Sequence, residues 1–174
     1  MKRIMIIGCG GAGKSTLSRK IHDILGVQLI HLDQYYWNPN WVETEKEQWA
    51  SIVENLVNKK NWVMDGNYGG TMDIRIARAD TIIFLNYPTL ICLFRVVKRV
   101  FQNWGKSRPD ISQGCVEKFD FEFFHYILNY NKTRRGKILQ KLTNLAPSKK
   151  IFILKKDKEV NEFLFSLNSQ ANNM

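Results

Sequence analysis

A nine-residue segment near the start of the chain constrains the fold more than any other feature. Residues 8–16 read G-C-G-G-A-G-K-S-T and directly follow the short apolar stretch Ile4–Ile7. The spacing matches G-x-x-x-x-G-K-S/T, a loop in which glycines let the backbone curl around an anion and turn its N–H groups inward. A helix that begins near Lys14 would add its positive end. The segment therefore predicts a strand, a phosphate-binding loop (P-loop) and a helix.

The same loop predicts a ligand class, a nucleoside triphosphate with Mg²⁺. Lys14 would reach the β- and γ-phosphates, and the hydroxyl of Ser15 would bind the metal. A chance match in a glycine-rich turn is the alternative, and the motif does not say what the phosphate is used for. The residues expected to bind ATP are consecutive: Gly8, Cys9, Gly10, Gly11, Ala12, Gly13, Lys14, Ser15 and Thr16.

The length and composition are those of one globular domain with an unusual charge. The chain has 174 residues, 44% of them apolar, and a formal net charge of +10. This charge suits anionic substrates, nucleic acid or an acidic membrane surface and does not distinguish among them. No apolar run approaches the about 18 residues of a membrane span, so we expect no membrane partner. The three cysteines are odd in number and lack CxxC spacing, which disfavours disulfides and zinc and predicts a cytoplasmic protein.

Apolar stretches alternate with stretches of helical period, which predicts an α/β fold with a parallel sheet. The expected strands are Arg3–Ile7, Gln28–Leu32, Trp62–Met64, Thr81–Leu85 and Lys150–Leu154. The expected helices are Lys14–Leu25, Thr44–Asn58, Thr71–Ala79, Thr89–Trp104, a longer helical region that ends near Leu145, and Lys158–Leu167. Thr44 and Glu47 have the spacing of a capping box.

Three stretches depart from this alternation. Tyr35–Val42 is aromatic, contains a proline and fits neither period. Gly105–Gly114 is polar and flanked by glycines, which predicts a mobile loop. The last residues are mostly Asn, Ser and Gln, so we expect a single domain over residues 1–167 and a disordered tail over residues 168–174.

Polar side chains follow three of the expected strands, at the edge where a parallel sheet binds its ligands. Asp33 follows the second strand, Asp65 the third and Asn86 the fourth. A phosphotransferase needs a group that deprotonates the attacking hydroxyl and a carboxylate that holds the metal. We assign Asp33 to the acceptor, because it leads into the aromatic segment, and Asp65 to Mg²⁺. The alternatives are exchanged roles, or aspartates that only cap a helix or a turn.

Basic residues gather after the fourth strand. Arg95 and Arg99 lie four residues apart on one helix face, and further cations follow: Lys106, Arg108, Lys132, Arg134 and Arg135. Arginines that close over a migrating phosphoryl group stabilise its charge and exclude water. The alternative is a solvated helix face. The glycine-flanked loop that follows favours closure, since mobile basic segments close such sites.

Histidines and aromatic residues give weaker signals. None of the three histidines has metal-ligand spacing, and His31, which lies inside a strand pattern, is expected to be structural. Trp37, Trp41 and Tyr68 either stack on a planar acceptor or pack against their neighbours.

Several sequence pieces together resemble a known family. They are the P-loop, H-L-D-Q-Y-Y-W-x-P-x-W, W-V-M-D-G-N-Y, and R-x-x-x-R followed by S-R-P-D-x-x-x-G-C. In these pieces, from Ile4 to about Leu167, the chain resembles the bacterial adenylate kinase-related proteins named DNA topology modulation proteins (FlaR-like). The resemblance implies a three-layer P-loop NTPase fold with a parallel sheet of five strands in the order 2-3-1-4-5. It also implies a small helical lid over about residues 102–131, Gln102–Asn131.

The resemblance implies roles for four arginines. By position, Arg95 resembles the adenylate kinase arginine that lies against adenine, and Arg99 resembles one that contacts phosphate. Arg134 or Arg135 resembles the arginines that return from the lid. The two cations inside the lid are weaker matches.

The chain also departs from the patterns of these relatives. Asn86 stands where we would expect aspartate in many of them, which moves the expected metal role onto Asp65. Tyr35–Val42 has no arginine to hold a monophosphate, which disfavours a nucleoside monophosphate as acceptor.

These observations favour a kinase that transfers the γ-phosphate of Mg-ATP to a small-molecule acceptor, which the sequence does not identify. Its expected catalytic residues are Lys14, Asp33, Arg99, Arg134 and Arg135, and it would act as a monomer or homodimer. The alternative is a nucleotide-dependent DNA-binding or regulatory protein, based on the net charge and the family name. No helix-turn-helix or zinc-finger pattern supports it. A signalling GTPase would need N-K-x-D, which is absent. A degenerate kinase that binds ATP without turnover is the remaining reading.

Overall fold

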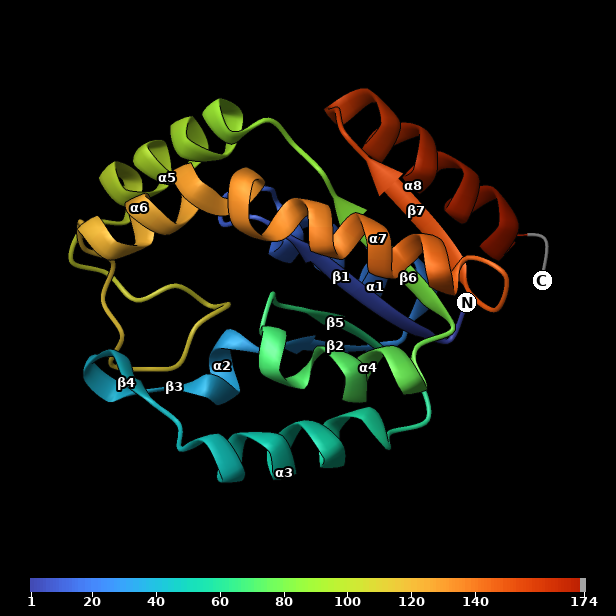
Figure 1. Cartoon of the computed structure of the whole chain (residues 1–174), viewed down its shortest axis with the longest axis horizontal. Coiled ribbons are helices and arrows are strands. Elements are labelled where there is room, and N and C mark those ends of the chain that lie inside the picture. Colours follow the sequence, from blue (N-terminus) through green and yellow to red (C-terminus); the bar gives the residue numbers. More distant parts are fainter. Residues whose placement is uncertain (173–174) are drawn as a thin grey trace.

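A twisted parallel sheet forms the centre of the protein, with helices on both of its faces (Figure 1). The computed structural model describes residues 1–172. The central strand β1 (Arg3–Gly8) pairs with β5 (Trp62–Asp65) on one side and with β6 (Thr81–Leu85) on the other. The outer strands are β2 (Gln28–His31), paired with β5, and β7 (Lys150–Leu154), paired with β6. The fold class predicted from the sequence is therefore correct.

The order of the sheet is β2-β5-β1-β6-β7. The strand numbers differ from those of the expected order, 2-3-1-4-5, because two short strands, which lie outside the main sheet, come between its second and third strands along the chain. β3 (Trp37–Asn38) and β4 (Val42–Glu43) form a separate antiparallel ribbon that the expectation did not include. When only the strands of the main sheet are counted, the two orders name the same arrangement.

Apolar residues on both sides of the central strands explain why this sheet forms. Ile4–Ile7 in β1 have no exposed surface, and all residues of β5 and β6 are buried. Continuous apolar runs of this kind are typical of parallel strands covered by helices on both faces. The five expected strands are confirmed to within one residue at each end.

The helices follow the expected alternation. They are α1 (Lys14–Leu25), the short α2 (Asp33–Tyr36), α3 (Lys46–Val57), α4 (Met72–Arg78), α5 (Thr89–Asn103) and α8 (Asp157–Asn172). The single-turn 3₁₀ helices are η1 (Pro39–Trp41) and η2 (Gly69–Thr71). The helices α1 and α8 pack together, as do α3 and α4, and right-handed crossovers place the two pairs on opposite faces of the sheet.

The segment expected to be one long helical region divides into three parts. α6 (Phe121–Tyr130) leads through a π-helical turn, η3 (Asn131–Arg135), into α7 (Gly136–Leu145). Figure 1 shows these parts as a continuous rod in front of the sheet, with α5 beside α6. A π turn adds a residue to the helical turn, and such turns often occur at functional sites.

Two expectations about helix ends are wrong. α3 begins at Lys46 after the N-cap residue Glu45, which makes no side-chain cap. Instead of capping that helix, the Thr44 hydroxyl donates to the carbonyl oxygen of Tyr36 at 2.5 Å and ties the aromatic segment to the start of α3. The tail expected to be disordered from residue 168 continues α8 as far as Asn172, and residues 173–174 lie outside the described residues.

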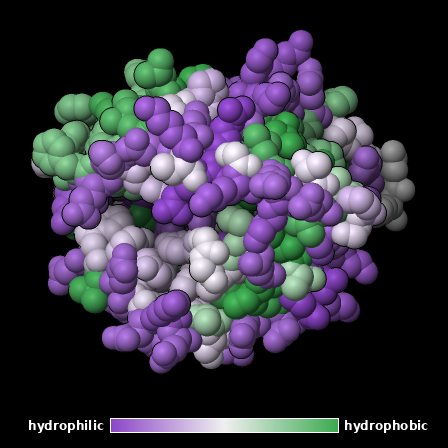
Figure 2. Space-filling model, in the orientation of Figure 1, coloured by the Kyte–Doolittle hydropathy of each residue, from purple (hydrophilic) through white to green (hydrophobic). Residues whose placement is uncertain are grey.

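The surface of this face is divided by polarity. Hydrophilic side chains extend across its middle, over α7, and apolar side chains gather at its upper left, over α5 and α6 (Figure 2). Leu90, Phe94 and Phe101 on α5 are each more than two-thirds exposed. Among the described helices, none is long and apolar enough to cross a membrane.

Candidate nucleotide and acceptor site

The P-loop has the geometry that its sequence predicts. Gly11 and Gly13 have φ angles of 78° and 93°, in the left-handed region that favours glycine. A Cβ atom on Gly11 would also lie 2.3 Å from the backbone oxygen of Cys92 in α5, so that helix packs directly on the loop. Lys14 starts α1, and its Nζ donates to the carbonyl oxygen of Cys9 at 3.0 Å. The loop therefore forms a cradle whose curvature depends on missing side chains.

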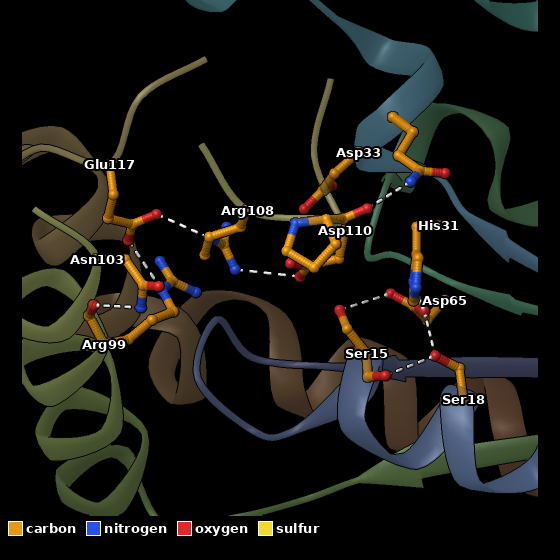
Figure 3. A network of polar contacts seen from close by, with 12 residues as sticks. Ser15, Ser18, His31, Asp33, Asp65, Arg99, Asn103, Arg108, Asp110 and Glu117 are labelled. Carbon is orange, nitrogen blue, oxygen red and sulfur yellow. Dashed lines mark hydrogen bonds and ion pairs between the residues drawn. The ribbon is translucent and has the colours of Figure 1, made fainter. Parts of the chain in front are cut away.

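Asp65 connects the P-loop helix with two neighbouring strands (Figure 3). The Ser15 hydroxyl donates to its Oδ1 at 3.1 Å, and the Ser18 hydroxyl donates to its Oδ2 at 2.5 Å. His31 Nδ1 lies 2.6 Å from the same Oδ2. Asp65 is only 5% exposed, so these partners satisfy a carboxylate that would be costly to bury alone.

Ser18 was not among the predicted site residues, and His31 was expected to be structural. Ser18 follows Ser15 by three residues, which places both hydroxyls on one face of α1, and this spacing was a usable signal. His31 pairs with Asp65 in the sheet register, so its closeness to the carboxylate depends on strand order.

The donor set around Ser15 fits Mg²⁺ bound together with a triphosphate. No group of three or more His, Cys, Asp or Glu side chains within residues 1–172 could hold a metal ion by itself. Mg²⁺ in nucleotide sites is usually held by one or two protein oxygens, with phosphates and water as the other ligands. The Ser15 hydroxyl and the Asp65 carboxylate are such oxygens, 3.1 Å apart.

Asp33 lies at the end of the neighbouring strand and begins α2. The Tyr68 hydroxyl donates to its Oδ1 at 2.6 Å. Burial raises the pKa of Asp33 above its usual range, while the bond from Tyr68 and the charge of Lys14 oppose that rise. Asp33 and Asp65 therefore stand at the same edge of the sheet as the P-loop. Which of them serves the acceptor and which the metal stays a prediction.

The four arginines singled out in the sequence have specific partners instead of facing only solvent. Arg95 binds both oxygens of Asp157, at 2.7 and 2.8 Å, and its Nη1 lies 3.9 Å from where a Cβ on Gly13 would be. Arg99 pairs with Glu117 at 2.9 Å. Arg134 lies over the ring of Tyr126, and Arg135 donates to Asn86 Oδ1 at 2.7 Å, at the end of β6. Each of the four has a different partner, so they do not meet at one group.

A chain of ion pairs connects the expected lid with α5 (Figure 3). Glu117 pairs with Arg99 and, at 2.8 Å, with Arg108, which in turn pairs with Asp110 at 3.1 Å. Burial alone would raise the pKa of Asp110, but Arg108 and the Ser15 hydroxyl lower it below its usual range. The sequence analysis assigned no role to Asp110 or Glu117, although the R-P-D motif contains the first of them.

The segment Gln102–Asn131 also contacts the aromatic segment that follows Asp33. The Gln34 amide donates to the carbonyl oxygen of Pro109 at 2.6 Å, and the Trp41 indole donates to that of Val116 at 2.9 Å. Trp41 and Trp37 pack edge to face, and Tyr68 packs against Tyr36 with ring centroids 4.5 Å apart. Of the two interpretations of these aromatic residues, packing against neighbours is the one that the structure supports.

Comparison with known proteins shows which fold this arrangement of strands and helices has. No protein-family model matches the sequence. The chain resembles a shikimate kinase from Bacteroides thetaiotaomicron, with a TM-score of 0.61 and 21% identity over 98% of both chains. It also resembles the shikimate kinase from Acinetobacter baumannii in complex with shikimate, with a TM-score of 0.64, 14% identity, and coverage of 99% of this chain and 94% of that one. The chain has the fold of the P-loop kinases.

The chain is also similar to another solved kinase structure and, in sequence, to one bacterial protein. A deoxyadenosine kinase from M. mycoides superposes with a TM-score of 0.55 and 17% identity, over 98% of this chain and 99% of that one. In sequence, 108 residues are 29% identical to the protein named "Uncharacterized protein YqaC" of Bacillus subtilis (strain 168). That match spans 61% of each chain, so the similarity covers less than two-thirds of the relative. The resemblance to the FlaR-like proteins finds no support among these relatives.

Proposed function

We propose that the protein is an ATP-dependent kinase that phosphorylates a hydroxyl group of a small molecule. The observation that supports this most directly is the position of Ser15, whose hydroxyl bonds to Asp65 at the mouth of the P-loop. Asp33 stands at the next strand end, in a fold shared with kinases of shikimate and deoxyadenosine. The relation to adenylate kinase-related proteins of the FlaR-like type is a finer part of the same proposal and rests on the sequence motifs alone.

Each part of the site has a role in this reaction. ATP supplies the phosphoryl group, and Mg²⁺ would offset the negative charge of its phosphates. Lys14 and the P-loop amides would hold the phosphates, and Ser15 and Asp65 would hold the metal. Arg95 would lie against the base, and Asp33 would accept the proton of the attacking hydroxyl.

Positive charge around the reacting groups comes from Arg99, Arg134 and Arg135. Charge that develops on a transferring phosphoryl group is stabilised most by cations already in position. Two of the three are held by hydrogen bonds, Arg99 by Glu117 and Arg135 by Asn86. We propose that the segment Gln102–Asn131 closes over the nucleotide and excludes water from it.

The experiment that tests this function is a screen for ATP consumption. The purified chain is given Mg-ATP and a panel of nucleosides, monophosphates, sugars, hydroxy acids and cofactor precursors, and ADP formation is measured. At least one compound should raise ADP formation well above the rate with water alone.

The variant Lys14→Ala supplies the control for this screen. Lys14 is expected to contact the β- and γ-phosphates, so its loss should lower turnover by about a hundredfold or more while the fold survives. Circular dichroism and thermal unfolding report the fold. A folded variant with unchanged ATP affinity and turnover would refute the assignment of the loop.

A further inference from the structure

A positively charged groove lies between α4 and α7, outside the P-loop cradle. Its first part is a cavity of about 300 Å³ lined by Asn67, Gly69, Met72, Arg134, Lys137, Ile138 and Lys141. A second cavity of about 350 Å³ shares Lys137 and Lys141 and extends to Leu145. The two cavities adjoin along α7, the helix that crosses the front of the sheet in Figure 1.

The groove is lined by more cationic than acidic side chains. Arg134, Lys137 and Lys141 are three and four residues apart, which places them on one face of the helical rod. Lys141 forms an ion pair with Asp73 on α4. Within residues 1–172, neither Arg134 nor Lys137 forms an ion pair. The groove therefore has a surplus of positive charge that a bound anion would balance.

The groove floor is apolar, and its rim is polar. Met72 and Ile138 are less than a tenth exposed and form part of the lining. A groove with an apolar floor and a few charged groups suits a small organic molecule with one anionic end.

The groove shares a loop with the candidate acceptor site. The Asn67 amide donates to the hydroxyl of Tyr126 at 2.6 Å, and the guanidinium of Arg134 lies 5.1 Å from the centre of that ring. Tyr68, the next residue of the loop, donates to Asp33. A molecule that reaches from the groove past this loop would bring its other end toward Asp33.

Gly69 leaves open the space in front of Arg134. A Cβ atom built on Gly69 would point at Arg134 Nη1 from 4.0 Å, and one on Gly70 would meet nothing within 4 Å. Backbone amides that lack neighbouring side chains can approach an anion closely. The loop and the guanidinium therefore face each other across a gap that a side chain at position 69 would narrow.

From this geometry we propose that the groove binds the anionic end of the phosphoryl acceptor, a carboxylate or phosphate group of a small organic acid. Lys137 contacts the anion together with Arg134, which takes this role in place of one beside the transferring phosphoryl group, and Lys141 extends the positive charge. The inference rests on the proposed kinase function and names its substrate class. It also accounts for the lack of an arginine in Tyr35–Val42, since the charge comes from η3 and α7 instead.

A titration with inorganic phosphate tests the groove directly. The P-loop is first saturated with Mg²⁺ and a non-hydrolysable ATP analogue, and backbone amide NMR spectra are recorded at low ionic strength, where charge attraction is least screened. The amides of Gly69 and Gly70 should shift saturably. Lys137→Gln should weaken this binding by about tenfold, as expected for one charge-assisted contact. Gly69→Ala should weaken it as well.

The matched control is Lys20→Gln, an exposed lysine of α1 that does not line the groove. It should leave the phosphate titration unchanged. Absence of shifts at Gly69 and Gly70, or an equal loss of affinity in Lys20→Gln, would overturn the proposal.

The acceptor screen tests the substrate class separately. Hydroxy acids and sugar phosphates should be phosphorylated faster than neutral sugars and nucleosides, and Lys137→Gln should raise their KM more than it lowers kcat. A neutral compound as the best acceptor would overturn the assignment of the anionic end. If no compound is phosphorylated while the amides of Gly69 and Gly70 still respond, the kinase function fails and the anion site stands.

Discussion

Asp65 holds the nucleotide side of the site together, because Ser15, Ser18 and His31 all bond to its two oxygens. These partners come from α1 and β2, while Asp65 itself ends β5. A single carboxylate therefore joins three elements beneath the P-loop. Within the described residues, the side chain of Asp33 accepts one hydrogen bond, from the hydroxyl of Tyr68. The difference in bonding predicts different effects of replacing the two carboxylates.

Asp33→Asn should suppress phosphoryl transfer and leave Mg-ATP binding nearly intact. Loss of a general base typically costs on the order of 10²–10⁴-fold in rate.

Asp65→Asn should raise the Mg²⁺ concentration needed for nucleotide binding. It should also lower the free energy of unfolding by about 1–3 kcal/mol, because buried donors lose a charged partner. Calorimetric nucleotide titrations at several Mg²⁺ concentrations measure the binding of Mg-ATP in each variant, and denaturant unfolding measures the free energy of unfolding. The reverse pattern would mean that the two roles are exchanged.

Tyr68→Phe should raise the pKa of Asp33 further. Burial already raises this pKa above its usual range, and the Tyr68 hydroxyl partly offsets that rise by donating to the ionised form. The base acts when ionised, so the acid limb of kcat/KM should move to higher pH in the variant. Carbon NMR of the Asp33 carboxyl follows the same titration without an acceptor. Tyr35→Phe, at an exposed position one residue before Tyr36, is the control and should leave the pKa unchanged.

The raised pKa of Asp33 also makes the stability of the fold depend on pH. A carboxyl whose pKa is raised by folding binds its proton more tightly in the folded chain than in the unfolded one. The contribution of Asp33 to stability is therefore greatest at low pH and falls as pH rises through the interval between the unfolded and folded pKa values. Removing the Tyr68 hydroxyl widens that interval.

At the scale of elements, the segment Gln102–Asn131 is held by contacts with two other parts of the protein. Glu117 and Arg108 connect it with Arg99 on α5, and Gln34 and Trp41 connect it with the aromatic segment. Phosphates bound in the P-loop would add negative charge that attracts Arg99 and Arg108, the arginines of these ion pairs. A change in nucleotide occupancy should therefore change the order of this segment.

Amide exchange in Gln102–Asn131 should slow when a non-hydrolysable ATP analogue binds with Mg²⁺. Closure brings separated cations onto one triphosphate, which offsets the entropy lost in ordering the segment. Hydrogen–deuterium exchange with mass spectrometry measures the change, and β5, which is fully buried, should barely respond. Equal exchange rates with and without a saturating analogue would show that the segment is not a lid.

For the whole molecule, the net charge of +10 is the basis of the DNA-binding alternative. If that charge alone attracts DNA, affinity should show no sequence preference and should fall on the order of 10³-fold or more between about 50 and 200 mM salt, for six or more phosphate contacts. Fluorescence anisotropy with two unrelated duplexes measures this. Sequence-specific binding that persists at high salt and depends on ATP would favour the alternative over the kinase.

Much of the architecture could be predicted from the sequence because its signals are local. The P-loop is defined by backbone angles that only glycines adopt easily, so nine consecutive residues predict its shape. The strands are buried on both faces, and their continuous apolar runs mark them to within a residue. The end of the last helix and the start of α3 were predicted wrongly. Asn168–Gln170 continue α8 although they are exposed, so their polar composition did not end the helix. At the start of α3, Thr44 bonds to the carbonyl oxygen of Tyr36, eight residues earlier, instead of capping the helix.

The sequence by itself determined the fold class, the P-loop and the two carboxylates at the edge of the sheet. Only the tertiary structure decided which side chains meet there. His31 reaches Asp65 through strand pairing, and the Gln34 amide reaches the carbonyl oxygen of Pro109, which lies 75 residues away along the chain. The groove along α7 likewise exists only because α7 packs beside α4. Periodicity and motifs report each residue's own neighbours along the chain, whereas charge pairing, pKa shifts and cavities depend on distances that the packing of separate elements sets.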